Sequence, residues 1–387
     1  MTPISSPFRR RYDVVVVGAR VAGASTAMLL ARHGLRVLTV DRAEPGADTL
    51  STHALMRAGV VQLARWGVLP AVREAPTPLV DRTTFHYGDD GATIAIRADE
   101  HADGLYAPRR RVLDPLLVAA ARAAGVDVRH GVELLDLRRD RRGRVDGVAV
   151  RAGDTTVEVA ADLVIGADGA RSRTARLVGA DSYRTGSHAS SSVFAYLQGI
   201  PHDGYHWHFA PGVASGAIPT NDELTCVFAS VPAHRFGREI RPDVRGGFWR
   251  VLRAASPELA DAAARARVDG RFRTFPGQHG FFRQSWGAGW ALVGDAGHFD
   301  DPSTAHGISG ALRDAELLAT AVLDGNLAAY QDARDDLALD IFTATDHISS
   351  FPADLDVLRG HHLALSRAMQ REAAVVAGWS RADSDAA

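Results

Sequence analysis

The sequence predicts an α/β fold into which an α+β segment is inserted. Three apolar runs, beginning near residues 14, 163 and 290, each end in a turn that contains glycine. Such runs are typical of parallel strands that are buried on both faces. Between them, shorter segments alternate apolar and polar residues, as strands with one buried face do. After residue 326 the spacing of apolar residues indicates amphipathic helices. We therefore expect a parallel sheet, an inserted antiparallel sheet and a helical C-terminal region.

The first predicted unit, residues 12–41, has the order strand, turn, helix, strand. Residues 14–17 are four valines, as expected for a central strand, and residues 18–23 (GARVAG) form the turn. The small and apolar residues of 24–32 predict a helix that lies close to the sheet, and 35–40 is the second strand. This order predicts a Rossmann-type unit.

The turn and the end of the second strand predict a nucleotide site. Backbone N–H groups at a helix start, helped by the helix dipole, bind a pyrophosphate. Asp41 follows the second strand and can accept hydrogen bonds from ribose hydroxyls. The middle glycine of the usual G-x-G-x-x-G pattern is replaced by Arg20, whose guanidinium can fold away or contact a phosphate. The unit predicts dinucleotide binding and by itself leaves NAD and FAD open.

In two later segments, a predicted strand again ends in a polar turn. Residues 162–172 (DLVIGADGARS) predict a strand that runs into a glycine turn around Asp168. Residues 289–298 (GWALVGDAGH) predict a strand that ends in Gly-Asp, and residues 301–310 (DPSTAHGISG) lead from it into a helix. Carboxylates that follow buried strands in this way lie at the edge of a sheet, where ligands bind.

Together, the three motifs closely resemble the p-hydroxybenzoate hydroxylase superfamily, the aromatic-hydroxylase-like branch of the FAD-dependent monooxygenases. The resemblance runs from residue 12 to about residue 323, with the motifs in the family's order and at its spacings. It implies FAD as the cofactor and NAD(P)H as a transient electron donor without a Rossmann domain of its own. It also implies a discontinuous FAD-binding domain (10–80, 107–180 and 284–326), a substrate-binding domain (81–106 and 181–283) and a C-terminal helical region (327–379).

The resemblance assigns individual residues to the cofactor. Asp295 falls where the family's carboxylate bonds a ribityl hydroxyl, and Asp168 where a carboxylate supports cofactor and pyridine-nucleotide binding. Arg57 matches an arginine beside the phosphate and ribityl chain, and Arg110 opens an R-x-x-L-x-x-x-L pattern that faces the flavin chain. Asp168 could instead cap the following helix, and both arginines could be surface residues. The expected cofactor-binding set is Gly18, Arg20, Val21, Ala22, Gly23, Asp41, Arg42, Arg57, Arg110, Asp168, Asp295, Pro302, Gly307 and Ile308.

Catalysis is expected around residues 302–309. A helix that begins near Gly307 would direct its N–H groups at one edge of the flavin and stabilise the anionic reduced state by ~0.3–2 kcal/mol. His53, His298 and His306 lie on segments next to the expected flavin site. We take His53 and His306 as catalytic candidates, acting as a general base or positioning the substrate. The alternative is that their hydrogen bonds hold a loop in place.

The inserted segments predict an antiparallel sheet with aromatic side chains. Residues 83–87 and 92–96 form a hairpin, and 192–197, 205–209, 213–218 and 224–231 continue the alternation. The aromatic residues are Phe85, Tyr87, Phe194, Tyr196, Tyr205, Trp207, Phe209 and Phe228. Such a surface suits a flat apolar or aromatic substrate, although alternating aromatic residues also occur in ordinary sheet cores.

Composition narrows the range of partners. The net charge is −2, all 44 basic residues are arginine, and no attraction to nucleic acid or an anionic membrane is expected. No apolar run approaches the ~20 residues of a membrane span. The short apolar run after the basic N-terminal residues reads as a strand and not as a signal peptide. A single cysteine, Cys226, fits a reducing compartment, so we expect a cytoplasmic protein, and we expect no metal site.

The leading functional hypothesis is a monooxygenase that uses NAD(P)H and O2 to hydroxylate or epoxidise an aromatic or polyunsaturated small molecule, in secondary metabolism. The main alternative is a flavin-dependent C=C reductase of the geranylgeranyl-reductase type. A non-catalytic flavin-binding protein and a nicotinamide-only dehydrogenase are further alternatives. Halogenases of this fold use a lysine, which the sequence lacks, and residues 205–211 echo their W-x-W-x-I-P motif only faintly. The C-terminal helices would pack on the FAD domain or on a second subunit, which leaves a homodimer open.

Overall fold

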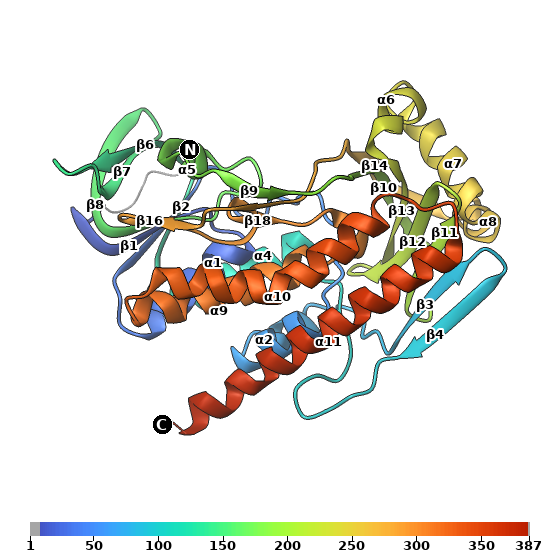
Figure 1. The fold of residues 1–387 in the computed structure, drawn as a ribbon, viewed down its shortest axis with the longest axis horizontal. Coiled ribbons are helices and arrows are strands. Elements are labelled where there is room, and N and C mark those ends of the chain that lie inside the picture. Colours follow the sequence, from blue (N-terminus) through green and yellow to red (C-terminus); the bar gives the residue numbers. More distant parts are fainter. Residues whose placement is uncertain (1–7, 386–387) are drawn as a thin grey trace.

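The computed structural model describes residues 8–385, with side chains described as far as residue 379. A parallel sheet and an antiparallel sheet lie at opposite ends of the molecule, and two long C-terminal helices run diagonally between them (Figure 1). The predicted mixed fold is therefore confirmed: a Rossmann-type sheet, an antiparallel insert and C-terminal helices.

The first sheet has the strand order β16-β17-β8-β1-β2-β5, and its strands are parallel except for β16. Two further strands, β6 and β7, continue from β8 as an antiparallel meander. The strands are β1 (Arg11–Val17), β2 (Val37–Asp41), β5 (Asp127–His130), β6 (Val132–Arg139), β7 (Val145–Ala152), β8 (Thr155–Gly166), β16 (Trp286–Gly287) and β17 (Trp290–Leu292). Strands from the beginning, middle and late parts of the chain thus meet in one sheet.

The valine run of β1 is buried because both faces of this sheet are covered. Val14 and Val16 belong to a core shared with three helices, whereas Val15 and Val17 belong to a core shared with the β6–β8 meander. The helices are α1 (Val21–Arg32), α4 (Arg110–Ala123) and α9 (Gly307–Leu323), and α1 packs against both others. The carboxyl ends of β1, β2 and β17 therefore open toward the starts of helices.

The second sheet has the order β14-β10-β13-β12-β11-β3-β4 and is antiparallel except where β11 lies parallel to β3. Its strands are β3 (Arg82–Tyr87), β4 (Asp90–Ala95), β10 (Ser190–Gln198), β11 (Tyr205–Ala210), β12 (Val213–Thr220), β13 (Leu224–Pro232) and β14 (Arg267–Phe275). The predicted aromatic residues all lie on one face, which joins the core that also contains α1 and α9. The opposite face is aliphatic over β10, β12 and β13, where it is covered by α7 (Val244–Ala255) and α8 (Pro257–Arg265).

The C-terminal helices connect the two sheets. Helix α10 (Leu327–Ile348) packs against α9 and α11, and α11 (Leu355–Asp385) also packs against α2 (Arg57–Arg65). A small third sheet of β9 (Ser182–Thr185), β15 (Phe281–Arg283) and β18 (His298–Phe299) lies where the chain passes between the two ends. The remaining helices are α3 (Leu69–Glu74), α5 (Arg173–Val178) and α6 (Phe236–Glu239).

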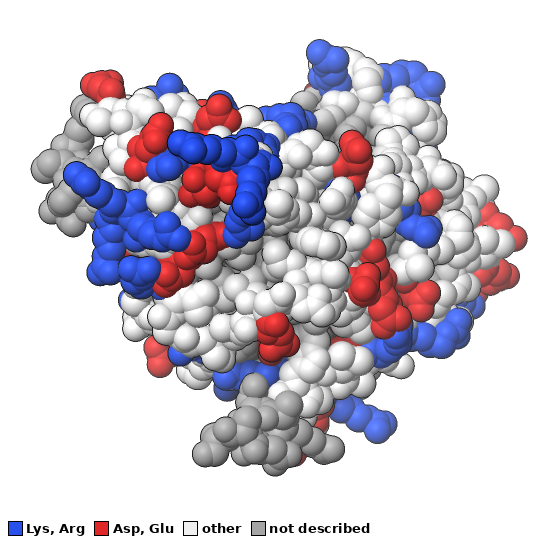
Figure 2. All heavy atoms as spheres, turned by 60° about the vertical axis from the view of Figure 1, so that its left-hand side comes forward, with Lys and Arg blue, Asp and Glu red and all other residues white. Residues whose placement is uncertain are grey.

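The surface shows no strong segregation of charge on the face in view in Figure 2. Arginine side chains gather over the end of the molecule that holds the parallel sheet, and acidic side chains lie among them. The middle of this face is mostly uncharged. Among the described residues, no helix is long and apolar enough to cross a membrane.

Candidate active site

The turn between β1 and α1 places two glycines where no side chain fits. A Cβ added to Gly18, whose φ is 110°, would lie 2.3 Å from the carbonyl oxygen of Ala167. A Cβ on Gly23 would lie 1.9 Å from the carbonyl oxygen of Gly18. Arg20 is the N-cap residue of α1, and no side chain caps the helix. Because a helix leaves its first N–H groups without intrahelical partners, those at Val21, Ala22 and Gly23 are available to an anion.

A cleft adjoins this turn at the end of β2. It contains about 510 Å³ of space that no atom fills, and Arg20 and Asp41 are among its lining residues. The Asp41 carboxylate accepts hydrogen bonds from the N–H groups of Ala19 and Ala43, each at 2.8 Å, which hold it at the strand end. Each oxygen keeps a further lone pair for a ribose hydroxyl. Arg42 is exposed and does not line this cleft.

Asp295 lies in a short 3-10 helix directly after β17 and has an unusual environment. Its carboxylate has no hydrogen-bond partner among residues 8–379, and burial raises its pKa to about 6, opposed by the nearby Arg110 guanidinium. Arg110 itself pairs with Asp114 at 2.7 Å. The turn packs on the start of α1, since a Cβ on Gly294 would lie 2.8 Å from that of Ala22. An unpartnered carboxylate beside the free helix start fits a polyhydroxylated cofactor chain.

The N-terminal end of α9 faces open space. The segment Pro302–Thr304 forms a 3-10 turn, and His306 is the N-cap residue of α9, with no side chain capping the helix. Gly307 is exposed, and a Cβ added there would meet nothing within 4 Å. The N–H groups at Gly307 and Ile308 therefore point out of an uncapped 17-residue helix into free space, as the predicted flavin contact requires.

Two predicted cofactor residues make other contacts in this structure. The Arg57 guanidinium pairs with Asp99 at 2.6 Å and donates to the carbonyl oxygen of Arg97. Asp168 accepts hydrogen bonds from the N–H groups of Arg173 and Thr174, at the start of α5. These are the contacts that the alternative interpretations expect, a surface arginine and a helix cap.

The predicted catalytic histidines are both buried and both have partners that are distant in sequence. His306 lies 3.0 Å from Glu372 of α11, which also pairs with Arg313 of α9 at 2.7 Å. Burial alone would raise the pKa of Glu372, but His306 and Arg313 lower it to about 2. His306 therefore ties the loop before α9 to α11.

His53 lies against the aromatic face of the antiparallel sheet. Its Nε2 is hydrogen-bonded to the hydroxyl of Tyr196, and the two rings stack. Burial lowers the pKa of His53 to about 3, so the ring is neutral at ordinary pH. Its φ of 68° lies in the left-handed region, a strained conformation for a residue other than glycine.

A charged cluster that the sequence did not predict surrounds this pair. The Arg109 guanidinium lies 3.8 Å from the centre of the Tyr196 ring and pairs with Asp48 at 2.6 Å. Arg273 approaches the same ring and the same carboxylate from β14. Burial would raise the pKa of Asp48, but Arg109 outweighs it and holds the pKa below its usual range. Buried polar atoms on Asp48, His53 and Arg109 have no hydrogen-bond partner.

An apolar pocket separates the aromatic face from the C-terminal helices. It contains about 430 Å³ of space that no atom fills. Trp207, Phe209 and Phe228 line it from the sheet, and Phe351 lines it from the connection between α10 and α11. Ser303, which belongs to the segment before α9, lines it as well. The pocket thus touches the segment that leads into the open helix start.

The chain is similar to known flavin enzymes. It matches the family described as an FAD binding domain over residues 11–344. A digeranylgeranylglycerophospholipid reductase of Methanothrix thermoacetophila is 29% identical over 345 residues, which are 83% of this chain and 82% of the relative. Aklavinone 12-hydroxylase RdmE of Streptomyces purpurascens is 33% identical over 215 residues, 50% of this chain and 40% of the relative. The structure of a triple mutant of the flavin-dependent brominase Bmp2 superposes with a TM-score of 0.81 and 18% identity, over 97% of this chain and 98% of that chain, which shows a shared fold.

Proposed function

This chain belongs to the FAD-binding family of p-hydroxybenzoate hydroxylase-like enzymes. From this premise we propose that it is an NAD(P)H-dependent monooxygenase that oxidises a small aromatic or polyunsaturated compound. The chain is an FAD-dependent oxidoreductase by family. The single observation that supports the choice of reaction is the aromatic-lined pocket of about 430 Å³ beside Ser303. Flat aromatic side chains line this pocket on the side of the sheet, as expected for a site that binds planar or conjugated compounds.

The residues around the open turns fit FAD. We assign the pyrophosphate to the start of α1, the adenosine ribose to Asp41, and the ribityl chain to Asp295. Bound FAD would accept hydride from NAD(P)H and activate O2. The uncapped N-terminus of α9 places positive charge density at the open end of the site and so favours an anionic flavin. We assign substrate binding to the antiparallel sheet, over residues 81–106 and 181–283.

The protein side chains would orient the substrate and exclude water. Trp207, Phe209 and Phe228 offer flat apolar surfaces, so the pocket selects a planar or conjugated compound over a charged one. The cluster of Asp48, Arg109 and His53 has unpaired polar atoms. A neutral His53 is hydrogen-bonded to the hydroxyl of Tyr196, and we assign this pair to positioning the substrate.

The reductase alternative is supported by the similarity to digeranylgeranylglycerophospholipid reductases, which extends over 83% and 85% of this chain for two of them. The aromatic lining of the pocket, with Trp207, Phe209 and Phe228, supports the choice of a planar or conjugated substrate over a phospholipid. Halogenation is not proposed despite the shared fold with the brominase, because the sequence contains no lysine.

Product analysis under labelled oxygen distinguishes the two reactions. The FAD-loaded enzyme is incubated with NADPH and a panel of phenols, polycyclic aromatics and polyenes, under ¹⁸O2 and separately under nitrogen. Monooxygenation predicts a product that carries ¹⁸O and forms only with oxygen. A product that has gained two hydrogens under nitrogen would overturn the monooxygenase proposal in favour of the reductase.

A further inference from the structure

Three histidines converge on the outer face of the antiparallel sheet, away from the aromatic pocket. His206 and His208 are two residues apart on β11, so their side chains lie on the same face of the strand. His86 of β3 is directly opposite His208 in the parallel pairing of the two strands. The intervening Trp207 points to the other face, where it lines the pocket.

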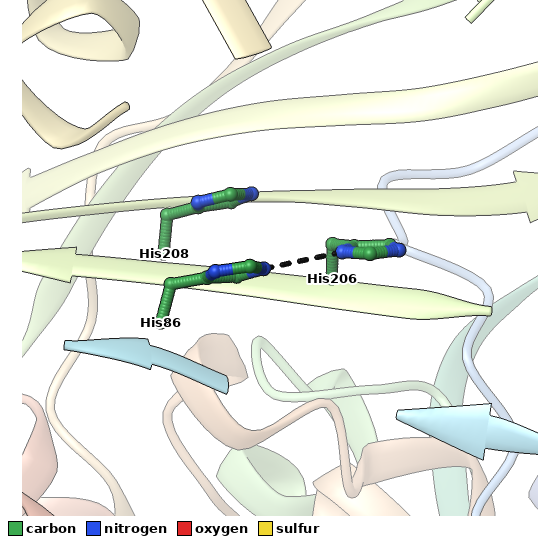
Figure 3. Close-up of side chains that lie close together, drawn as sticks. All are labelled: His86, His206 and His208. Atoms are coloured by element: carbon green, nitrogen blue, oxygen red, sulfur yellow. Dashed lines mark hydrogen bonds between the residues drawn. The ribbon is translucent and has the colours of Figure 1, made fainter. Parts of the chain in front are cut away.

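The ring nitrogens are close enough to share one ion. One nitrogen of each ring lies within 4.8 Å of the others. His86 Nε2 is 3.3 Å from His206 Nδ1, and the rings of His86 and His208 are stacked with their centres 4.2 Å apart (Figure 3). All three side chains are partly accessible. The stacked rings of His86 and His208 are almost parallel, so both would have to rotate about their Cβ–Cγ bonds to direct their nitrogen lone pairs at one ion.

The carboxylate of Asp203 holds the His206 ring in the way that carboxylates hold metal-binding histidines. His206 Nε2 lies 2.7 Å from Asp203 Oδ1. An ionised carboxylate only accepts hydrogen bonds, so His206 carries its proton on Nε2. The lone pair of Nδ1 then faces His86. Metal-binding histidines usually donate their second ring N–H to a carboxylate in this manner.

Two carboxylates near the cluster would offset the charge of a cation. Asp203 bonds His206, and Glu258 of α8 lies close enough to His86 to interact with it electrostatically. Arg82 lies 3.9 Å from the second oxygen of Asp203. The surroundings therefore carry more acidic than basic charge.

We propose that His86, His206 and His208 bind one divalent transition-metal ion, with Zn²⁺ the best match, and that Asp203 positions His206. Three imidazole ligands and an open fourth position are a coordination that Zn²⁺ adopts, and oxygen-preferring ions such as Mg²⁺ do not suit it. This differs from the expectation, drawn from the single cysteine, that the chain has no metal site. It does not rest on the proposed reaction.

Binding at this position would fasten an edge of the sheet. The hairpin of β3 and β4 is the outermost part of the sheet, and every residue of β4 is exposed. His86 and His206 are 120 residues apart in sequence, so an ion between them closes a long loop. The inner face of the same two strands carries Phe85 and Trp207, whose rings stack. The metal would thus stabilise the wall of the apolar pocket from behind.

The test is a Zn²⁺ titration of the tag-free FAD-loaded enzyme, measured by isothermal titration calorimetry. The enzyme is first dialysed against EDTA, which is then removed. We expect one equivalent of Zn²⁺ to bind, and Zn²⁺ to raise the melting temperature. His86→Gln and His208→Gln should each weaken binding by more than about 100-fold, and Asp203→Asn by about 10- to 100-fold. His361→Gln is the matched control, because His361 forms another close histidine pair with His347 and should leave binding unchanged.

Co²⁺ gives a second readout on the wild-type chain alone. A Co²⁺-loaded enzyme should show intense visible ligand-field bands of a four-coordinate site in the difference spectrum. The proposal is overturned if the wild-type enzyme takes up no Zn²⁺ in the micromolar range and shows no such bands. It is equally overturned if His208→Gln, with normal FAD content and circular dichroism, binds Zn²⁺ as the wild type does.

Discussion

Asp295 presents a carboxylate that no described protein group binds. It follows a buried strand, is partly accessible, has no hydrogen-bond partner within residues 8–379, and has a pKa raised by burial to about 6. Asp41 differs, because two backbone N–H groups hold it in place. Under the proposed assignment, the two carboxylates bind different parts of the cofactor.

Replacing Asp295 with alanine should separate cofactor binding from folding. We expect Asp295→Ala to lose about 1.5–3 kcal/mol of FAD affinity, the contribution of a hydrogen bond to a charged group. The free energy of unfolding of the apoprotein should not fall, because no protein contact is lost. Flavin fluorescence titration and urea unfolding measure the two quantities. Asp324→Ala, an exposed residue after α9, is the control, and equal FAD affinity of the two variants would contradict the assignment.

Residues whose role follows from local sequence could be predicted, and residues whose role depends on a distant partner could not. Gly18, Asp41 and Asp295 each follow a strand, so a strand and a turn suffice to place them. His306 instead depends on Glu372, 66 residues later in a helix whose rotation the sequence leaves open. His53 depends in the same way on Tyr196, 143 residues away.

At the scale of elements, the start of α9 is the feature that would join cofactor and substrate in the proposed function. The helix is uncapped, its first residue is an exposed glycine, and the segment before it carries Ser303 into the apolar pocket. Ala305, in that segment, has a φ of 53°, a left-handed conformation that costs energy for alanine. The strain is consistent with a segment whose shape serves a ligand.

A methyl group at this helix start should interfere with FAD and not with folding. Gly307→Ala meets no atom within 4 Å, so the apoprotein should be as stable as the wild type or more stable by up to about 1 kcal/mol. FAD affinity should fall by about 1–3 kcal/mol because the added carbon occupies space needed by the ligand. Gly360→Ala, on α11 with equally free surroundings, is the control for the helix effect. Unchanged FAD affinity in Gly307→Ala would show that the flavin does not approach this helix.

Helices and strands were predicted correctly where apolar residues recur in the sequence at a regular spacing. The strands of the antiparallel sheet follow from their alternation, and their aromatic residues do share one face. The helices α7 and α8, which cover the other face, were not predicted, nor was the β6–β7 meander. Their apolar residues contact surfaces that form only when distant segments meet, so the sequence alone carries little signal of them. Helix α1 begins at Val21, three residues before the predicted start, because Arg20 already adopts the N-cap conformation.

The stability of the whole molecule depends on pH because it contains buried histidines that stay neutral in the folded state. Burial lowers the pKa of His53 and of His208 to about 3 and that of His362 to about 4, from an ordinary value of 6.5. Below pH 6.5 the unfolded chain takes up protons that the folded chain does not. Stability is therefore full above pH 6.5 and falls as the pH decreases toward the folded values.

Replacing one of these histidines tests the direction in which stability changes with pH. In the presence of EDTA, the free energy of unfolding of the wild type should fall between pH 6.5 and about 3. His53→Gln should reduce the slope by up to about 1.4 kcal/mol per pH unit, the contribution of one proton. His279→Gln, at an exposed position, serves as the control. If the slope of His53→Gln matched that of the wild type, His53 would not be neutral and buried in solution.

The central claim is that three separated stretches of this chain form one FAD site that exchanges electrons with NAD(P)H and O2. The most direct test is a visible absorbance spectrum of the purified protein, followed by anaerobic addition of NADPH and then by air. The account predicts two flavin bands with one FAD for each chain, bleaching by NADPH and recovery on contact with O2. A colourless protein that also fails to take up added FAD would contradict it, and Arg20 would then be the residue that prevents nucleotide binding.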